Sequence, residues 1–171
     1  SRQMLRMVRN INGSWKDHVG TTGVTCYTCH RGQQVPQYVW YKDPGQPHAS
    51  DMAGNRAGQN APSTVVGLTS LPNDPFSAYL NAQTPSIRVV STAALPDNNA
   101  STIKQAEASY GLMMHMSESL GVNCTFCHNS RSFAAWDSST PQRATAWYGI
   151  RMVRDANAHY LEPLTATFPA N

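Results

Sequence analysis

Apolar residues recur at helical spacing in three parts of the chain. In the first part they lie three or four positions apart, at Met4, Val8, Ile11 and Trp15. Positions with this spacing share one face of an α-helix, and a glycine after the last of them is a common helix end. Because Gly20 follows closely, we predict a helix over residues 3 to 19.

The second part predicts a helix over residues 101 to 120. Asn and Ser side chains near its start are suitable N-caps, and Gly121 is suited to end it. Its predicted buried stripe consists of Ile103, Ala106, Tyr110, Met113 and Leu120.

The third part begins at Thr140-Pro141, where proline suits the first position of a helix. The helical pattern continues to about Tyr160, and Pro163 follows it. Since proline cannot continue a helix without losing a hydrogen bond, we predict that this helix ends before Pro163.

Residues 36 to 96 lack such a pattern and are dense in Gly, Pro, Asn and Ser. We predict a long irregular loop there, with one short strand at residues 87 to 91. The chain has 11 Gly and 11 Pro, and only 13% of its residues are charged. The predicted fold class is therefore mainly α with long irregular loops, and something other than a large aliphatic core organises it.

All four cysteines lie in two copies of one motif, Cys26-Tyr-Thr-Cys29-His30 and Cys124-Thr-Phe-Cys127-His128. Two thiols at this spacing form thioether bonds to the vinyl groups of one haem, and the next histidine reaches its iron. With 6 His among 171 residues, accident would place His after both pairs about once in a thousand sequences. The sequence therefore predicts two covalently attached c-type haems, and electron transfer rather than substrate turnover.

Three other uses of Cys-x-x-Cys fit less well. Zinc sites built from two such pairs usually hold them about 15 to 20 residues apart, whereas most of this chain separates the two pairs. A thioredoxin-like redox pair needs a strand before it and a helix after it. A disulfide within Cys-x-x-Cys closes a strained small loop.

The motifs divide the chain into a first haem-binding segment (residues 1 to 35), the long loop (36 to 96) and a second haem-binding segment (97 to 171). We predict one compact domain with a multihaem cytochrome c fold, built from repeated helix-loop-CxxCH units. The first residues already have a helical pattern without a start signal, so we expect the chain to be cut at its N-terminus.

The chain also contains a short internal repeat. Arg6-Met-Val-Arg9 with Asn12 recurs as Arg151-Met-Val-Arg154 with Asn157. In the first copy the Cys-x-x-Cys-His motif begins 20 residues after Arg6, and the same count from Arg151 reaches position 171. We expect the repeat to be broken off about where a further motif would begin.

The residue opposite the motif histidine strongly affects the potential of a c-type haem, because Met raises it and a second His gives a lower one. Met113, Met114 and Met116 all precede Cys124, and we choose Met113 because it lies nearest the centre of the apolar stripe. For the first haem we choose Met4, which lies on the apolar stripe of its helix.

His18 lies too close to Cys26 to fold back easily onto the haem of that motif. It is either an ordinary surface or core histidine, or a ligand of a different haem. The sequence offers no spacing argument for His48, His115 or His159, and we predict that they are structural.

The formal net charge of +3 does not indicate a nucleic-acid partner. Two haems would add four propionates and bring the net charge to about −1. No block of Lys and Arg with interleaved aromatic residues is present either. The sequence shows no signal peptide, and no apolar run approaches the roughly 18 residues of a membrane span.

Distinctive runs extend around and beyond the motifs: Arg-Asn-Ile-Asn at 9 to 12, Trp15, His18, Gly-Val-Thr-Cys-Tyr-Thr-Cys-His-Arg-Gly at 23 to 32, Thr-Ser-Leu-Pro-Asn-Asp-Pro at 69 to 75, and Gly-Val-Asn-Cys-Thr-Phe-Cys-His-Asn at 121 to 129. In these runs the chain resembles the tetrahaem cytochrome subunit of the photosynthetic reaction centre of purple bacteria. The resemblance covers nearly the whole chain and is far more specific than the two motifs alone.

In that family three haems have His/Met ligation and one has His/His ligation. The resemblance implies that Met4 ligates the haem at Cys26 and Cys29, and that Met113 ligates the haem at the second motif. It also implies that His18 is the distal ligand of a fourth haem, attached outside these residues. The first and fourth motifs of the family are absent here, so the chain resembles the middle of the family's sequence.

The resemblance further implies a periplasmic electron carrier attached to the photosynthetic inner membrane. It would accept electrons from a soluble donor, such as a small cytochrome c or a high-potential iron-sulfur protein. It would pass them to the oxidised bacteriochlorophyll pair of the reaction-centre membrane subunits. The alternatives are a free-standing multihaem cytochrome c of a respiratory chain and a dihaem peroxidase. A Met or His on both irons argues against the peroxidase, which needs an open or displaceable distal site.

Overall fold

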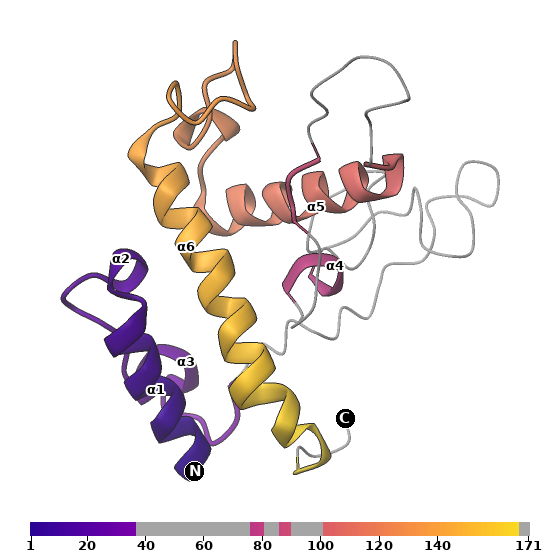
Figure 1. Cartoon of the computed structure of the whole chain (residues 1–171). Helices are drawn as coiled ribbons and strands as arrows, with labels where there is room; N and C mark the ends of the chain where they lie inside the picture. The colour runs from indigo at the N-terminus through magenta and orange to yellow at the C-terminus, as the bar shows by residue number, and fades with distance from the viewer. Residues whose placement is uncertain (37–75, 81–85, 90–100, 168–171) are drawn as a thin grey trace. The chain divides into compact units, whose positions relative to one another are not determined.

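The computed structural model describes residues 1–36, 76–80, 86–89 and 101–167 (Figure 1). These residues are mainly helical and form no strand, which confirms the predicted mainly α class for this part of the chain. Contacts divide the chain into two units. The first contains Ser1–Val39, Leu80–Ala82 and Pro141–Asn171, and the second contains Trp40–Tyr79 and Gln83–Thr140.

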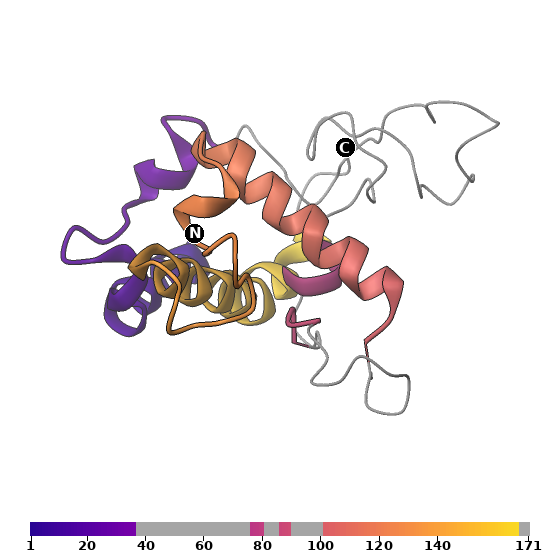
Figure 2. The ribbon, with the colours of Figure 1, turned by 90° about the horizontal axis from the view of Figure 1, so that it is seen from above.

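The first unit is built on two helices, α1 (Arg2–Ser14) and α6 (Pro141–Ala156), which lie side by side in both views (Figures 1 and 2). Gln3 at the start of α1 donates from Nε2 to the carbonyl of His159, at 3.1 Å. His18, beyond the end of α1, contacts the carbonyl of Thr145 near the start of α6. The two helices are therefore antiparallel.

The predicted helix over residues 3 to 19 is two helices, because the chain breaks at Trp15. Trp15 has φ −119° and ψ 34°, and a separate short helix, α2 (Lys16–Val19), follows it. The indole Nε1 of Trp15 donates to Oδ2 of Asp155 on α6, at 3.1 Å. The break thus occurs at a residue whose side chain is bonded to another helix. The spacing of apolar residues within 3 to 19 does not reveal this contact.

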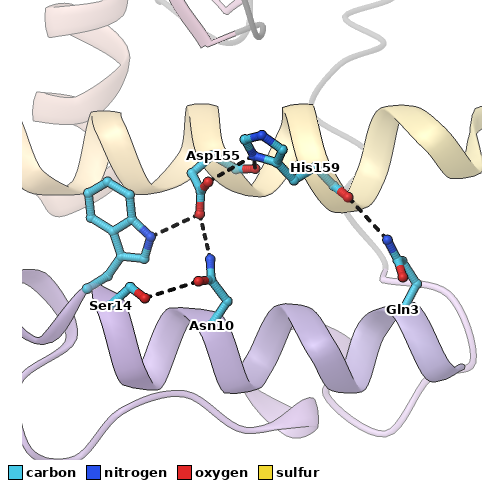
Figure 3. Close-up of polar contacts among 6 residues, drawn as sticks. Gln3, Asn10, Ser14, Asp155 and His159 are labelled. Carbon is cyan, nitrogen blue, oxygen red and sulfur yellow. Dashed lines mark hydrogen bonds and ion pairs between the residues drawn. The ribbon is translucent and has the colours of Figure 1, made fainter.

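Asp155 is the polar centre of the contact between α1 and α6 (Figure 3). Its Oδ2 also accepts from Nδ2 of Asn10, at 2.6 Å, and its Oδ1 lies 2.9 Å from Nδ1 of His159. Only 26% of the Asp155 side chain is exposed. The carboxylate therefore contacts three side chains. Because it is half-buried, these hydrogen bonds are stronger than they would be at an open surface.

The end of α6 differs from the prediction that a helix stops before Pro163. The chain continues through a π-helical turn, η3 (Asn157–Leu161), into a 3-10 helix, η4 (Glu162–Thr167). Pro163 is the second residue of η4, where a backbone N–H has no partner within the helix, so proline fits there. Asn157 is buried in η3 and donates from Nδ2 to the carbonyl of Leu80, at 2.6 Å.

The main helix of the second unit is α5 (Ile103–Leu120). The prediction that Gly121 ends it is confirmed, since Gly121 adopts φ 66° and ψ 32°. The N-cap is Thr102 rather than the predicted Asn or Ser. Thr102 and Gln105 form a capping box, in which Gln105 N donates to Oγ1 of Thr102 and Thr102 N donates to Oε1 of Gln105, at 3.2 and 2.7 Å.

The predicted buried stripe of α5 is wrong in most of its members. Ile103, Tyr110 and Leu120 are 76%, 55% and 61% exposed. Leu112 and Ser109 are buried instead, and α4 (Ser77–Leu80) and the segment at residues 86–89 are each hydrogen-bonded to α5. In these hydrogen bonds Tyr79 Oη donates to the carbonyl of Gln105, at 2.9 Å, and Ser109 Oγ donates to the carbonyl of Ile87, at 2.8 Å.

The same contact explains why the described part of the predicted strand at residues 87 to 91 is not a strand. Ile87 lies in a bend, and its carbonyl accepts from a side chain of α5 rather than from a neighbouring strand. Arg88 N is bonded to the hydroxyl of Ser86, at 3.1 Å. Val90 and Ser91 lie outside the described residues, as does most of the predicted loop at 36 to 96.

Large apolar side chains that are fully buried are few in the part of the chain that the structure describes. The buried hydrophobic residues there are Ile11, Phe76, Tyr79, Leu80 and Leu112. This agrees with a composition that predicts organisation by something other than a large aliphatic core. None of the helices formed by the described residues is both long and apolar enough to cross a membrane.

We predict that Asp155→Ala lowers the free energy of unfolding of the haem-loaded protein by about 2 kcal/mol, because hydrogen bonds to a charged group are lost and Asn10 and Trp15 lose their acceptor. Denaturant titration followed by circular dichroism measures this. Asp137→Ala is the matched control, since among the described residues Oδ1 of Asp137 is bonded to the adjacent Ser138 alone. Equal losses in the two variants would contradict the role of Asp155.

Candidate haem-attachment sites

The first motif forms a short helix, α3 (Cys26–His30). Thr25 N donates to Oγ1 of Thr28 at 2.9 Å, which fixes the first turn within four residues. The helix ends at Arg31, whose φ of 47° is left-handed. Residues three positions apart lie close together on a helix, so the turn brings the two cysteines to one side.

The second motif begins with a single 3-10 turn, η2 (Cys124–Phe126). Asn123 caps this turn, because its Oδ1 accepts from Thr125 N at 3.0 Å. Thr25 and Asn123 hold equivalent places before their motifs, and both have extended backbones. The two motifs thus start from the same local arrangement, although the turns that follow differ.

A glycine with φ 66° lies three residues before the first cysteine of each motif, at Gly23 and Gly121. Gly23 is also held by its surroundings, since a Cβ there would lie 2.6 Å from Oδ1 of Asn12. The Asn12 side chain donates to the carbonyl of Val24 at 2.8 Å and accepts from Val24 N at 2.6 Å. Asn12 therefore fastens the chain just before the first motif to α1, the helix that carries Met4.

The histidine of each motif makes one hydrogen bond of the same kind. Nδ1 of His30 lies 3.1 Å from the carbonyl of Gln33, and Nδ1 of His128 lies 3.0 Å from the carbonyl of Phe133. Because a carbonyl only accepts, Nδ1 carries the proton and Nε2 keeps its lone pair. The Phe133 ring also stacks on the His128 ring, at 5.1 Å between centroids. Both imidazoles are thus held in the tautomer that binds a metal through Nε2.

The donor groups fit a c-type haem. Cys26 and Cys29 are exposed, Cys124 and Cys127 are half-buried, and none of the four is joined in a disulfide. Two accessible thiols beside an imidazole with a free Nε2 lone pair are the groups that thioether attachment and iron ligation require. In the described ranges no three side chains of the His, Cys, Asp or Glu type converge as a metal site made of protein ligands alone.

The predicted sixth ligands lie on the helices that precede the motifs. Met4 is half-buried on α1, and Met113 is half-buried on α5. Their ligation of iron stays a prediction.

His18 is half-buried on α2 and lies against α6 of the same unit. Its Nδ1 is 2.9 Å from the carbonyl of Thr145, so its Nε2 also keeps a lone pair. The ring lies over Gly149, where an added Cβ would be 2.5 Å from Cε1. Sequence reasoning did not connect these residues. The available signal was a glycine inside a strongly helical pattern, which costs stability and usually has a packing reason.

The comparisons with known proteins agree on one family. The family model of the photosynthetic reaction centre cytochrome C subunit matches residues 1–171. The chain is 55% identical over 172 residues to the photosynthetic reaction center cytochrome c subunit of Rubrivivax gelatinosus, covering 100% of this chain and 47% of that protein. For the subunit of the same name from Thermochromatium tepidum the identity is 52% over 171 residues, covering 100% and 42%.

The third relative, the subunit of the same name from Roseobacter denitrificans, is 40% identical over 179 residues, covering 99% of this chain and 47% of that protein. The chain therefore spans less than half the length of each of these relatives. Because the family model covers every residue and the three relatives match nearly all of them, the chain belongs to the family of photosynthetic reaction centre cytochrome c subunits.

Proposed function

We propose that this chain carries two c-type haems and transfers electrons through them. Cys26 and Cys29 hold the first haem with His30 as ligand, and the second motif holds the other with His128 as ligand. The observation that carries the proposal is the repeated arrangement of two thiols beside an imidazole whose Nδ1 is bonded to a carbonyl. When bound, each haem supplies an iron that accepts and releases one electron.

The protein's own groups then have separate tasks. The thiols form the covalent attachment, and each Nε2 lone pair binds iron. The carbonyls of Gln33 and Phe133 keep the imidazoles oriented, as second-shell acceptors do for metal-bound histidine. Met4 and Met113 close the opposite sides, which favours electron transfer over reaction of the iron with a substrate.

The haem-binding segments are residues 1 to 35 and 97 to 171, and together they form repeated helix-loop-CxxCH units of a multihaem cytochrome c. The support is the shared entry to both motifs, in which a helix is followed by a left-handed glycine and a capping residue with an extended backbone. His18 ligates a further haem attached outside these residues.

The family and the names of the relatives support a specific role for this electron transfer. We propose that the chain works on the periplasmic side of the photosynthetic inner membrane. It receives electrons from a soluble donor, such as a small cytochrome c or a high-potential iron-sulfur protein. It passes them to the oxidised bacteriochlorophyll pair held by the reaction-centre membrane subunits. A Met or His on each iron separates this role from that of a peroxidase.

Covalent attachment is tested by intact mass and by extraction with acidified acetone. We expect the mass of this segment to exceed that of the polypeptide by two haems and the pigment to stay with the protein. Cys127→Ala should leave one thioether at the second motif and reduce the yield of mature protein. Ser130→Ala, a nearby exposed serine, is the control. Extraction of all the pigment would refute the proposal.

Ligation by Met113 is tested with Met113→His. The imidazole should lower the potential of one haem by roughly 0.1 to 0.3 V, within the span of about 0.8 V that axial ligands set. It should also remove the weak far-red charge-transfer band that sulfur ligation gives, while the haem at Cys26 and Cys29 stays unchanged. Redox titration followed by absorption measures both. If Met114→His has these effects and Met113→His does not, the ligand is the neighbouring methionine.

Ligation by His18 is tested with His18→Met in the full-length protein. Because a thioether ligand favours the reduced iron more than imidazole does, the potential of one haem should rise by roughly 0.1 to 0.3 V. That haem should not be either of the two attached to this segment. A titration in which all potentials stay at their original values would show that His18 binds no iron.

A further inference from the structure

The short repeat of Arg-Met-Val-Arg is a repeat in space as well as in sequence. A shift of 145 positions carries Arg6 onto Arg151, and the same shift carries Asn10 onto Asp155. These two equivalent residues are bonded to each other across α1 and α6, at 2.6 Å. The two copies of the repeat therefore pack against one another through matching positions.

The asparagine of each copy also has a matching contact. Asn12 donates from Nδ2 to the carbonyl of Val24 at 2.8 Å, and Asn157 donates from Nδ2 to the carbonyl of Leu80 at 2.6 Å. In both copies the amide fastens the repeat helix, or the turn that extends it, to another segment of the first unit. The correspondence between the copies is thus supported by contacts as well as by residue identity.

The same shift carries Met4 onto Gly149. The first copy has its proposed ligand at this position, whereas the second copy has no side chain there. What lies over Gly149 is the imidazole of His18, which comes from α2. An added Cβ at residue 149 would lie 2.5 Å from Cε1, 2.9 Å from Nδ1 and 3.1 Å from Nε2 of His18.

We propose that Gly149 occupies the ligand position of the second repeat copy and determines which side chain completes the haem of that copy. By lacking a side chain it leaves room for His18, which takes the place that methionine has in the first copy. This inference rests on the proposed function, in which His18 ligates a haem outside these residues.

The surroundings of His18 explain why the glycine is needed. The carbonyl of Thr145, one helical turn before Gly149, holds Nδ1 of the ring at 2.9 Å, so the ring cannot move away without losing that bond. Contacts below 3.0 Å between a Cβ and heavy atoms of another side chain are essentially not tolerated, and Cε1 and Nδ1 of His18 would lie below that limit. Any side chain at residue 149 therefore displaces the imidazole from α6. Gly149 and Thr145 are positioning residues for His18.

The first experiment uses Gly149→Ala in the full-length, haem-loaded protein. The methyl group should displace His18 without supplying a ligand. One haem should then become high-spin, as detected by electron paramagnetic resonance, and should bind added cyanide. Gly13→Ala is the matched control, because it adds the same methyl group to α1 where nothing lies within 4 Å. All haems staying low-spin in Gly149→Ala would overturn the proposal.

The second experiment uses Gly149→Met, which restores the methionine of the first copy. One haem should gain the far-red charge-transfer band of sulfur ligation and a higher potential, while the two haems attached to this segment keep theirs. If this variant fails to fold, His18→Ala with Gly149→Met removes the clash and should give the same band. A high-spin haem in the double variant would overturn the proposal.

These variants separate this inference from the proposed function on which it rests. If His18→Met leaves every potential unchanged, His18 is no ligand and the proposed function loses that assignment. If His18→Met shifts one haem but Gly149→Ala and Gly149→Met change none, His18 is a ligand and Gly149 does not select it.

Discussion

A hydrogen bond from Nδ1 of histidine to a backbone carbonyl occurs at His30, His128 and His18, and the proposed iron chemistry depends on it. The bond places the proton on Nδ1 and leaves Nε2 as the electron-pair donor. At His30 and His128 the carbonyl lies 3 and 5 residues further along the chain, so the loop itself orients the ring. At His18 the carbonyl lies 127 residues away, on α6, and orientation requires tertiary packing.

Helix α1 connects these separate sites in the first unit. One of its faces contacts α6 through Asn10 and Asp155, and Asn12 holds the chain that leads into the first motif. Met4 lies on the same helix. A displacement of α1 would therefore change two things at once. It would move Met4, the proposed sixth ligand, relative to the first motif, and it would disturb the packing that holds His18 against α6. This coupling makes a few polar contacts more important than the small apolar core would suggest.

The features that sequence analysis predicted correctly depend on near neighbours. The helical stop at Gly121 follows from the conformational freedom of glycine, and the motifs are defined by adjacent residues. The burial of Ser109 on α5 could not be predicted, because its hydroxyl is bonded to the carbonyl of Ile87, which is distant in sequence. For the same reason the break at Trp15 was missed, since its indole is bonded to Asp155. The contact of His18 with Gly149 is equally non-local.

Some of these hydrogen bonds join residues a few positions apart and others join distant segments, so they form at different stages of folding. The turn at Cys26 and the bond of His30 close loops of only 3 residues, and such loops form faster than contacts between distant segments. Cys26, Cys29 and His30 therefore reach their local arrangement before contacts between distant segments form. The hydrogen bond of His18 to Thr145 forms only after α2, which carries His18, has packed against α6. Under the proposed function, haem attachment at the first motif therefore needs only local structure, whereas ligation by His18 needs the packed helices of the first unit.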